Sequence, residues 1–269
     1  MTAINAPDVS VITPTFRRER EVVEALQSVL SQQGVSVESI VIDDSPDGSA
    51  DAAVAQVGDP RVRYVRQAMP SGGRPALVRN HGLGLASGRY ISFLDDDDRL
   101  MPGALETLVR ALDEDPCAGV AFGTVEPFGN DEDVLRAQQA YFRSASSRAR
   151  SRRRMPALVA TLLFQNTVLV NSACVIRREC VSKLGGYDPE ISRCEDVEFY
   201  MRAIRRFGFV FVDRPVLEYR TGAPSLMHSM VDDGPLRRSY ALTHRKYRET
   251  HGALEFFALK ALAKLLSPS

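Results

Sequence analysis

The chain has 269 residues and carries 34 basic and 34 acidic side chains, so its formal net charge at pH 7 is zero. Because no net positive charge attracts a polyanion, we expect no nucleic-acid partner. Hydrophobic residues make up 44% of the chain, which excludes a mainly disordered or collagen-like protein. The length suits one large α/β domain or two small ones.

The first half of the sequence alternates short apolar segments with segments of helical periodicity. Strands are predicted at Val9 to Ile12, Ile40 to Ile42, Val62 to Val65, Tyr90 to Leu94 and Ala118 to Phe122. Helices are predicted between them at Arg20 to Gln33, Ser49 to Val57, Pro75 to Ala86 and Pro102 to Glu114. We expect Ser49 to cap the second of these helices. The alternation predicts an α/β fold with a mostly parallel central sheet.

The second half of the sequence is less regular. It predicts a strand at Asn171 to Ile176, a helix at Asp196 to Phe207, a strand at Phe209 to Val212 and a helical tail at Pro235 to Leu266, broken near Gly252. Between Arg143 and Arg154 the chain carries six arginines and no acid. We interpret this arginine run as a mobile, solvated segment, although it could also attract phosphate, anionic lipid or an acidic saccharide.

Two apolar segments bear on membrane contact. Pro156 to Ile176 is uncharged and nearly long enough to span a bilayer, but it contains Gln165 and Asn166, so we interpret it as buried helix and strand. In the tail, a helical stripe is formed by Leu254, Phe257, Ala258, Ala261, Leu262 and Leu265, with Lys260 and Lys264 between them. We expect the stripe to pack on the domain or on a second subunit, with a membrane surface as the alternative.

The cysteines and the first residues indicate the compartment. No two of the four cysteines have the CxxC spacing of a metal site, so we interpret them as buried, reduced thiols of an intracellular protein. Met1 to Asp8 lacks the basic and apolar segments of a signal peptide. The sequence therefore predicts a cytoplasmic protein.

Polar side chains gather at the carboxyl ends of three predicted strands, where open α/β sheets bind ligands. They are Thr13 to Thr15, Asp43-Asp44 and Asp95 to Asp98. Four adjacent carboxylates repel one another unless a cation or donors offset the repulsion, and such oxygen-rich clusters suit Mg²⁺ or Mn²⁺. A solvated turn is the alternative for the aspartate run. For Asp43-Asp44, the choice lies between an Asx turn and a contact with a nucleoside.

Glu195 and Asp196 open the helix predicted at Asp196 to Phe207. Acids at a helix start are stabilised by the helix macrodipole, so simple capping is one interpretation. The other is a general base that reaches the hydroxyl of an acceptor.

Six motifs occur in a fixed order along the chain. They are Val11 to Phe16, Ile42 to Ser45 with Asp47 to Ser49, Ala76 to Gly82, Phe93 to Asp98, Gly185 to Asp188 and Glu195-Asp196. In this order they resemble the family 2 glycosyltransferases, which are inverting enzymes with the GT-A fold. The resemblance covers Val9 to Arg220 and implies a mostly parallel central sheet flanked by helices, with a helical C-terminal tail.

The resemblance implies a role for each motif on the donor side. Thr13, Pro14, Thr15 and Asp44 would line the base and ribose of a nucleotide-diphosphate sugar, and Arg79 would approach the nucleotide or diphosphate. A uridine donor is favoured, with thymidine and guanosine donors left open.

The resemblance also implies a metal ion and a catalytic base. Asp95 and Asp97 would form the family's DxD motif, with Asp96 beside the donor and Asp97 as a direct ligand of Mn²⁺ or Mg²⁺. His228 would complete the metal shell or close over the diphosphate, with a surface histidine as the alternative. Asp196 would be the catalytic base, and Glu195 would contact the acceptor.

On this resemblance, residues 1–125 form the nucleotide-sugar-binding half of one GT-A domain. Residues 126–230 form its acceptor-binding and catalytic-base half, and residues 231–269 form the tail. The implied acceptor is a glycan or a lipid-linked acceptor of bacterial polysaccharide or glycoconjugate synthesis. Peripheral contact with the inner face of the membrane and a homodimer are left open.

Two other classes of protein were weighed. A phosphatase or nucleotidyltransferase fits less well, because the aspartates follow the fourth strand and Thr13 to Arg20 contains no glycine. A module that binds a nucleotide sugar or glycan without turnover is the remaining alternative, although both the metal acids and the base are present.

Overall fold

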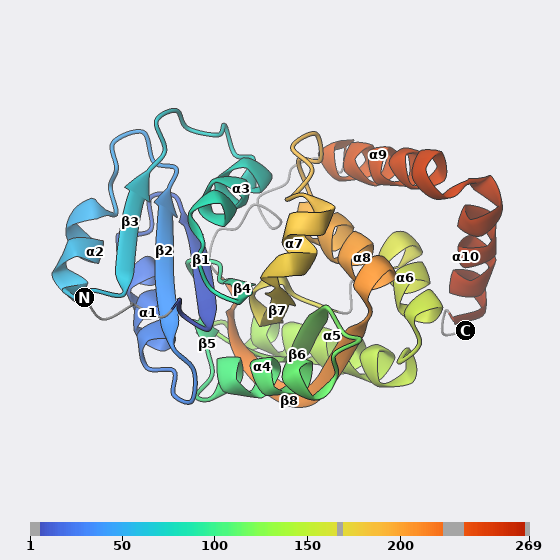
Figure 1. Ribbon diagram of the computed structural model, residues 1–269, viewed down its shortest axis with the longest axis horizontal. Coiled ribbons are helices and arrows are strands. Elements are labelled where there is room, and N and C mark those ends of the chain that lie inside the picture. The colour runs from blue at the N-terminus through green and yellow to red at the C-terminus, as the bar shows by residue number, and fades with distance from the viewer. Residues whose placement is uncertain (1–5, 166–168, 223–233, 267–269) are drawn as a thin grey trace.

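The computed structural model describes residues 6–165, 169–222 and 234–266. Eight strands form one sheet in the order β3-β2-β1-β4-β7-β6-β8-β5 (Figure 1). The strands are β1 Val9–Thr15, β2 Val37–Asp43, β3 Val62–Arg66, β4 Tyr90–Phe93, β5 Arg99–Leu100, β6 Val120–Phe128, β7 Cys174–Arg177 and β8 Phe209–Arg220. The sheet includes strands from both halves of the chain.

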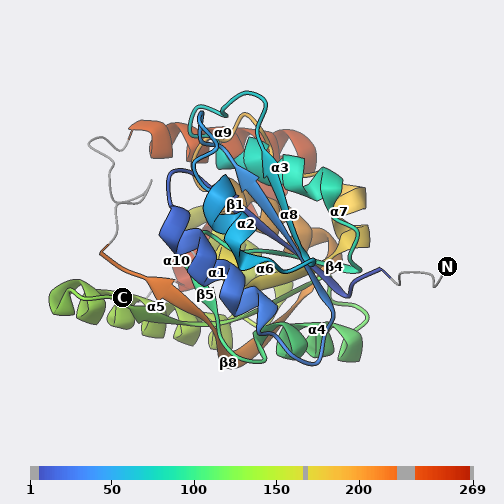
Figure 2. The same cartoon turned by 90° about the vertical axis from the view of Figure 1, so that its left-hand side faces the viewer.

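Helices surround this sheet. They are α1 Glu19–Leu30, α2 Asp51–Val57, α3 Pro75–Leu85, α4 Ala104–Glu114, α5 Glu132–Ser151, α6 Met155–Phe164, α7 Arg178–Leu184, α8 Glu195–Phe207, α9 Gly234–His251 and α10 Ala253–Leu266. Helices α3 and α4 lie on opposite sides of the sheet (Figure 2). The order of elements agrees with the sequence prediction. The structure also contains three elements that were not predicted: the short strand β5, the long helix α5 and the short helix α7.

The parallel strands bring the predicted polar motifs to one edge of the sheet. Strand β1 pairs in parallel with β2 and with β4, so that Ile12 lies opposite both Ile40 and Phe93. Thr15 therefore ends β1 opposite Asp43, and the aspartate run follows β4 at the same edge. Strand β7 runs antiparallel to β4 and β6, so the sheet is mostly parallel with an antiparallel strand near its middle.

Side-chain alternation along β1 fills both faces of the sheet. Ile12 packs with Ile40 and Phe93 in the core under α3, α6 and α8, whereas Val9 and Val11 pack in the core under α1 and α4. Each such side chain, fully buried, stabilises the fold by about 1.5–3 kcal/mol. This two-sided core makes the edge of the sheet a rigid support for the acidic residues.

The arginine run begins inside helix α5, which ends at Ser151, and its last three arginines follow the helix. Contacts hold the run in place, which contradicts the prediction of a mobile segment. Helix α5 starts at the N-cap Asp131 and buries Phe142, Ala145 and Ala149, an i, i+3, i+7 stripe that the core covers. Arg150 donates to Asp213 at 2.6 and 2.7 Å. Packing of the apolar stripe overrides the repulsion between arginines, which point in different directions around the helix.

Three smaller predictions were also wrong. The N-cap of α2 is Ala50, not Ser49, because the Asp43 carboxylate accepts the Ala50 amide at 3.0 Å. Cys117 is exposed, while Cys174 and Cys180 are buried. The chain forms a 3₁₀ turn at Asn171–Ala173 before β7 begins.

The tail breaks at Gly252 as predicted, where φ is +84°. The predicted apolar stripe, however, faces outward: Leu254, Phe257 and Leu265 are exposed, whereas Phe256 and Leu259 are buried. Helix α10 has enough apolar residues for two faces, and periodicity could not tell which face meets the domain. Within the described ranges, the helices are too short or too polar to cross a bilayer.

Candidate active site

The ends of β1 and β2 are joined by hydrogen bonds at the site edge. The Asp44 amide donates to the Thr15 carbonyl at 2.9 Å, and the Thr15 hydroxyl donates to Asp96 Oδ2 at 2.8 Å. The Asp44 carboxylate accepts from both the amide and the hydroxyl of Ser71, each at 2.6 Å. The buried Thr13 hydroxyl has no partner in the structure. Thr15, Asp44 and Asp96, which were predicted to contact the donor, therefore lie together. Ser71, which was not predicted from the sequence, holds Asp44 in place.

Asp43 holds the turn after β2. Its carboxylate is fully buried and accepts from the amides of Ser45 and Ala50 and from the Tyr64 hydroxyl. Burial and the contact with Asp43 raise the pKa of Tyr64. Of the two neighbouring acids, Asp43 thus has the turn-forming role, while Asp44 faces Ser71.

The aspartate run forms a tight turn after β4, closed by the Asp98 amide donating to the Asp95 carbonyl at 3.1 Å. Arg18 donates to Asp96 at 2.8 Å and to Asp97 at 2.6 Å. Asp98 is buried and accepts the amide of Arg220 at 3.1 Å, which ties the turn to the end of β8. The turn is therefore a built cluster rather than a solvated loop.

Burial removes water from the carboxyl groups of this cluster, and its arginines offset only part of that cost. Desolvation raises the pKa of Asp96 to about 7, although Arg18 opposes the shift. Desolvation also raises the pKa of Asp97, and the pKa of Asp98 well above its usual value. An added cation would stabilise the ionised form of all three carboxyl groups.

The donor atoms of the turn fit a divalent cation that prefers oxygen ligands. The arginine contacts use Oδ1 of Asp95 and Oδ2 of Asp97, so each carboxylate has a second oxygen to offer. In the part of the chain that the structure describes, no group of three or more His, Cys, Asp or Glu side chains is arranged to hold a metal. An ion here would take its other ligands from phosphate and water, as Mg²⁺ commonly does. His228 lies outside the described residues.

Arg79, on α3, connects the aspartate turn to the start of α8. It donates to Asp95 at 2.7 Å and to Glu195, and its side chain is only 7% exposed. With the Asn171 amide turned to satisfy its neighbours, its oxygen accepts from Arg79 Nε at 3.1 Å. The guanidinium also lies 5.6 Å from the centre of the Tyr187 ring. Arg79 was predicted to approach the nucleotide or diphosphate; the structure shows it engaged with both acidic groups.

A clamp between α3 and the segment before α8 fixes this geometry. Asn80 donates to the Tyr187 carbonyl and accepts the Tyr187 amide, both at 2.8 Å. A Cβ at Gly186 would lie 2.1 Å from the Asn80 side-chain oxygen, so this position requires glycine. The Tyr187 ring stacks on Phe199 of α8 with 4.4 Å between ring centres. The Gly185 to Asp188 motif thus sets the position of α8.

Helix α8 begins after a strained residue, Cys194, whose φ is +53°. Glu195 is buried against Arg79, and desolvation raises its pKa to about 7 despite that cation. Asp196 is half-buried, and its carboxylate forms no ion pair within the described ranges. Burial raises its pKa, while Arg79 and helix amides lower it. A carboxylate of raised pKa without a salt-bridge partner is suited to accept a proton.

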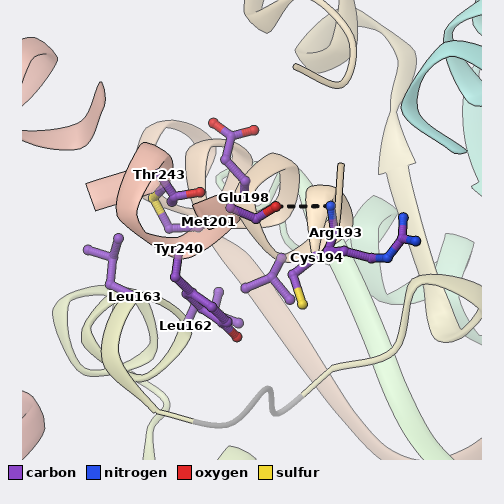
Figure 3. A pocket seen from close by; sticks show the side chains of 10 residues that line it. Leu162, Leu163, Arg193, Cys194, Glu198, Met201, Tyr240 and Thr243 are labelled. Atoms are coloured by element: carbon purple, nitrogen blue, oxygen red, sulfur yellow. Dashed lines mark hydrogen bonds between the residues drawn. The ribbon is translucent and has the colours of Figure 1, made fainter. Parts of the chain in front are cut away.

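A small pocket lies at the start of α8, where Cys194 and Val197 line it (Figure 3). It lies between α6, α8 and α9 and is lined by Leu162, Leu163, Cys194 and Tyr240 among others. The Ser239 hydroxyl accepts the Arg193 amide at 3.1 Å at its rim. Residues of the tail helix α9 and of the start of α8 therefore lie on either side of this pocket.

The predicted residues thus meet in one place, although they come from distant parts of the sequence. Asp44, Asp95, Asp96, Asp97, Arg79, Glu195 and Asp196 line or support the same edge of the sheet. The sequence analysis missed Arg18, Ser71 and Asn171. Arg18 lies two residues after the motif Val11 to Phe16, so its position was the one available signal. Asn171 opens a predicted strand but carries no motif, and Ser71 lies in a segment without a recognisable pattern.

Comparison with known proteins identifies the family. The model of the family described as "Glycosyl transferase family 2" matches residues 10–185. An uncharacterized protein of Mycobacterium tuberculosis is 33% identical over 214 residues, which are 77% of this chain and 65% of that protein. The GalNAc(5)-diNAcBac-PP-undecaprenol beta-1,3-glucosyltransferase of Campylobacter jejuni is 37% identical over 127 residues, 46% of this chain and 38% of that protein.

Comparison with solved structures identifies the fold. The crystal structure of S. aureus TarS 1-349 in complex with UDP-GlcNAc has a TM-score of 0.68 at 17% sequence identity, over 96% of this chain and 71% of that one. The protein therefore belongs to glycosyl transferase family 2 and has the GT-A fold that the sequence predicted. The chain spans less than two thirds of the length of the curated relatives named above.

Proposed function

We propose that the protein is an inverting glycosyltransferase. It moves a sugar from a nucleotide-diphosphate donor, favoured to be a UDP-sugar, to a hydroxyl of a glycan or lipid-linked acceptor in bacterial polysaccharide or glycoconjugate synthesis. The observation that carries the proposal is the double contact of Arg79 with Asp95 and Glu195, which sets the aspartate turn beside the unpaired Asp196.

Two relatives support the choice of donor and acceptor. TarS has been solved with UDP and with UDP-GlcNAc, which supports a uridine donor here. The Campylobacter relative is named for transfer to an undecaprenol-linked saccharide, which supports a lipid-linked acceptor. With such an acceptor, the proposed location is the cytoplasm, peripherally at the inner face of the membrane.

On the donor side, Thr13, Pro14, Thr15 and Asp44 would line the base and ribose. The Asp44 carboxylate accepts two hydrogen bonds from Ser71, which hold it in place for a ribose hydroxyl or a base N–H. Because Asp44 and Thr15 are joined directly, the two sides of this subsite are fixed before the donor arrives.

Asp95 and Asp97 would hold Mn²⁺ or Mg²⁺, with His228 as a further proposed ligand. When bound, the ion would offset the charge on the diphosphate leaving group. The raised pKa values of Asp96 and Asp97 support this assignment, because burial desolvates those carboxyl groups and the contact with Arg18 offsets only part of that cost.

Asp196 would take the proton of the acceptor hydroxyl as that oxygen attacks the anomeric carbon. Its raised pKa brings its basicity closer to the operating pH. Glu195, held by Arg79, would position the acceptor beside it. A single displacement with the base on the acceptor side inverts the anomeric configuration.

Nucleotide binding tests the proposal. The melting temperature of the protein is measured with UDP, GDP, dTDP and CDP, each with and without Mn²⁺. At about a hundred times its dissociation constant, a bound nucleotide stabilises the fold by about 2.7 kcal/mol. We expect a Mn²⁺-dependent shift with UDP that Asp97→Asn abolishes and that Asp51→Asn, at an exposed carboxylate on α2, leaves unchanged.

The same protein is then assayed for UDP release from UDP-sugars with lipid-linked and free glycan acceptors. UDP release that depends on the acceptor supports transfer. No shift with any nucleotide contradicts the donor site, and a shift without turnover across the acceptors indicates a binding module.

A further inference from the structure

Helix α10 is attached to the protein by one apolar face. Phe256, Leu259 and Ala263 are buried there, mainly against α6. The Arg152 guanidinium donates to the Leu266 carbonyl at 2.6 Å and so fastens the end of the helix. One face of the helix is therefore fixed against the domain, and the side chains on the opposite face point away from it.

The opposite face is also apolar and lies open. Leu254 is 88% exposed, Leu265 83% and Phe257 55%, and the alanines 258 and 261 are exposed with them. At about 100° per residue, these five side chains share one strip along the helix. We call them the outer stripe. Helix α10 itself lies at the edge of the molecule, at the far end from α2 and β3 (Figure 1).

Large apolar side chains are otherwise rarely exposed on this protein. Of the six that are exposed in the described part of the chain, three belong to the outer stripe and a fourth, Met155, starts the adjoining helix α6. A concentration of this kind marks a contact surface rather than ordinary exposure.

The charges around the outer stripe have one sign. Lys260 and Lys264 are exposed along one edge of it. The only acid of α10, Glu255, is bound to Arg205 at 2.8 Å and to the Tyr247 hydroxyl. Because Glu255 is engaged in this way, it does not neutralise the lysines.

The arginine run adds to this positive rim. Arg152 reaches the carbonyl of Leu266, which brings the exposed Arg153 and Arg154 to the same end of α10. These arginines add positive charge at that end of the helix, with Arg153 also acting on Asp213.

We infer that the outer stripe and its basic rim dock the protein on an anionic lipid surface. A bilayer takes Leu254, Phe257 and Leu265 into the headgroup and acyl boundary, while Lys260 and Lys264 extend to the anionic headgroups. A second copy fits less well, since an identical stripe offers Lys260 and Lys264 no acid of α10 other than Glu255, which Arg205 and Tyr247 already engage. This inference deepens the proposed location at the membrane by naming the surface that docks, and docking itself requires no sugar transfer.

Vesicle sedimentation tests the inference. The full chain is mixed with vesicles of phosphatidylcholine alone or with about a third phosphatidylglycerol, and the bound fraction is measured. We expect binding to the anionic vesicles that weakens with salt and is much lower on phosphatidylcholine alone.

Two variants and two controls locate the contact. Phe257→Ser with Leu265→Ser should lower the partition coefficient by at least about tenfold. Lys260→Gln with Lys264→Gln should lower it several-fold for each charge removed, since each contributes on the order of a fivefold change. Met69→Ser and Lys183→Gln, at exposed sites elsewhere, should leave it unchanged. All four proteins should melt at the same temperature, since the altered side chains are exposed.

Three results would overturn the inference: no binding to either vesicle, binding that the outer-stripe variants leave intact, or a dimer in sedimentation that Phe257→Ser dissociates. The last would assign the outer stripe to a second copy. Each readout is independent of nucleotide binding and transfer. A negative vesicle result therefore leaves the proposed sugar transfer standing, and a negative nucleotide result leaves the proposed docking standing.

Discussion

Two acidic groups face each other across the site, and the protein compensates them differently. In the turn after β4, Arg18 pairs with Asp96 and Asp97, and Arg79 pairs with Asp95. At the start of α8, Arg79 pairs with Glu195, whereas Asp196 has no ion pair within the described ranges. The aspartate turn is thus held by arginines, while one carboxylate of α8 is left available.

This difference separates acids with a structural role from an acid that is available to accept a proton. A buried acid that is paired with arginine keeps its place, because removing the partner leaves an uncompensated charge. An acid without such a partner gains basicity from burial and loses little structure when it is changed. We therefore expect substitutions that break the arginine pairs to lower mainly the stability, and a substitution of Asp196 to lower mainly the activity.

The largest effect is expected from Asp196→Asn. The amide keeps the shape of the side chain but cannot accept the acceptor's proton, so the rate of transfer should fall by about 10²–10⁴-fold. Stability should change little, since no ion pair is lost. The measurement is kcat for transfer beside the melting temperature. If transfer continues at near the original rate, Asp196 is not the base.

Arg79→Met is expected to have the opposite profile. It leaves Asp95 and Glu195 without their shared cation, and loss of one partner of a buried pair costs about 3–5 kcal/mol. Urea unfolding measures the loss. The matched control is Arg150→Ala, which breaks the exposed pair with Asp213 and should cost at most about 1 kcal/mol. Equal losses for the two variants would mean that Arg79 does not hold the site together.

The smallest effect concerns pH. Asp96 and Glu195 have pKa values raised to about 7 by burial, against ordinary values near 4. Between about pH 5.5 and 7 the folded protein therefore holds protons that the unfolded chain has released, so stability falls as pH rises.

Without metal or nucleotide, the free energy of unfolding should drop by about 3 kcal/mol over that range, roughly half of it from each group. Urea titrations at several pH values measure it. Asp96→Asn should flatten the profile, and Glu114→Gln, at an exposed carboxyl on α4, should not. A profile that is the same in all three proteins would contradict the raised pKa of Asp96.

The family, the order of strands and helices in the first half and the positions of the acidic motifs can be predicted from the sequence alone. These features are local: strand alternation, helical periodicity and the polar residues that directly follow a strand can be read within a few residues. The assignment of residues 1–125 and 126–230 to donor and acceptor, and the metal role of His228, stay predictions.

The pairing of charges, in contrast, depends on how distant parts of the chain fold together. Arg79 and Glu195 are 116 residues apart, and Arg18 and Asp96 are 78 apart, so no local pattern could join them. The same holds for the arginine run, which packing holds in place, and for α10, whose two apolar faces are alike in sequence. Which face is buried depends on where α6 lies, and long-range packing sets that position.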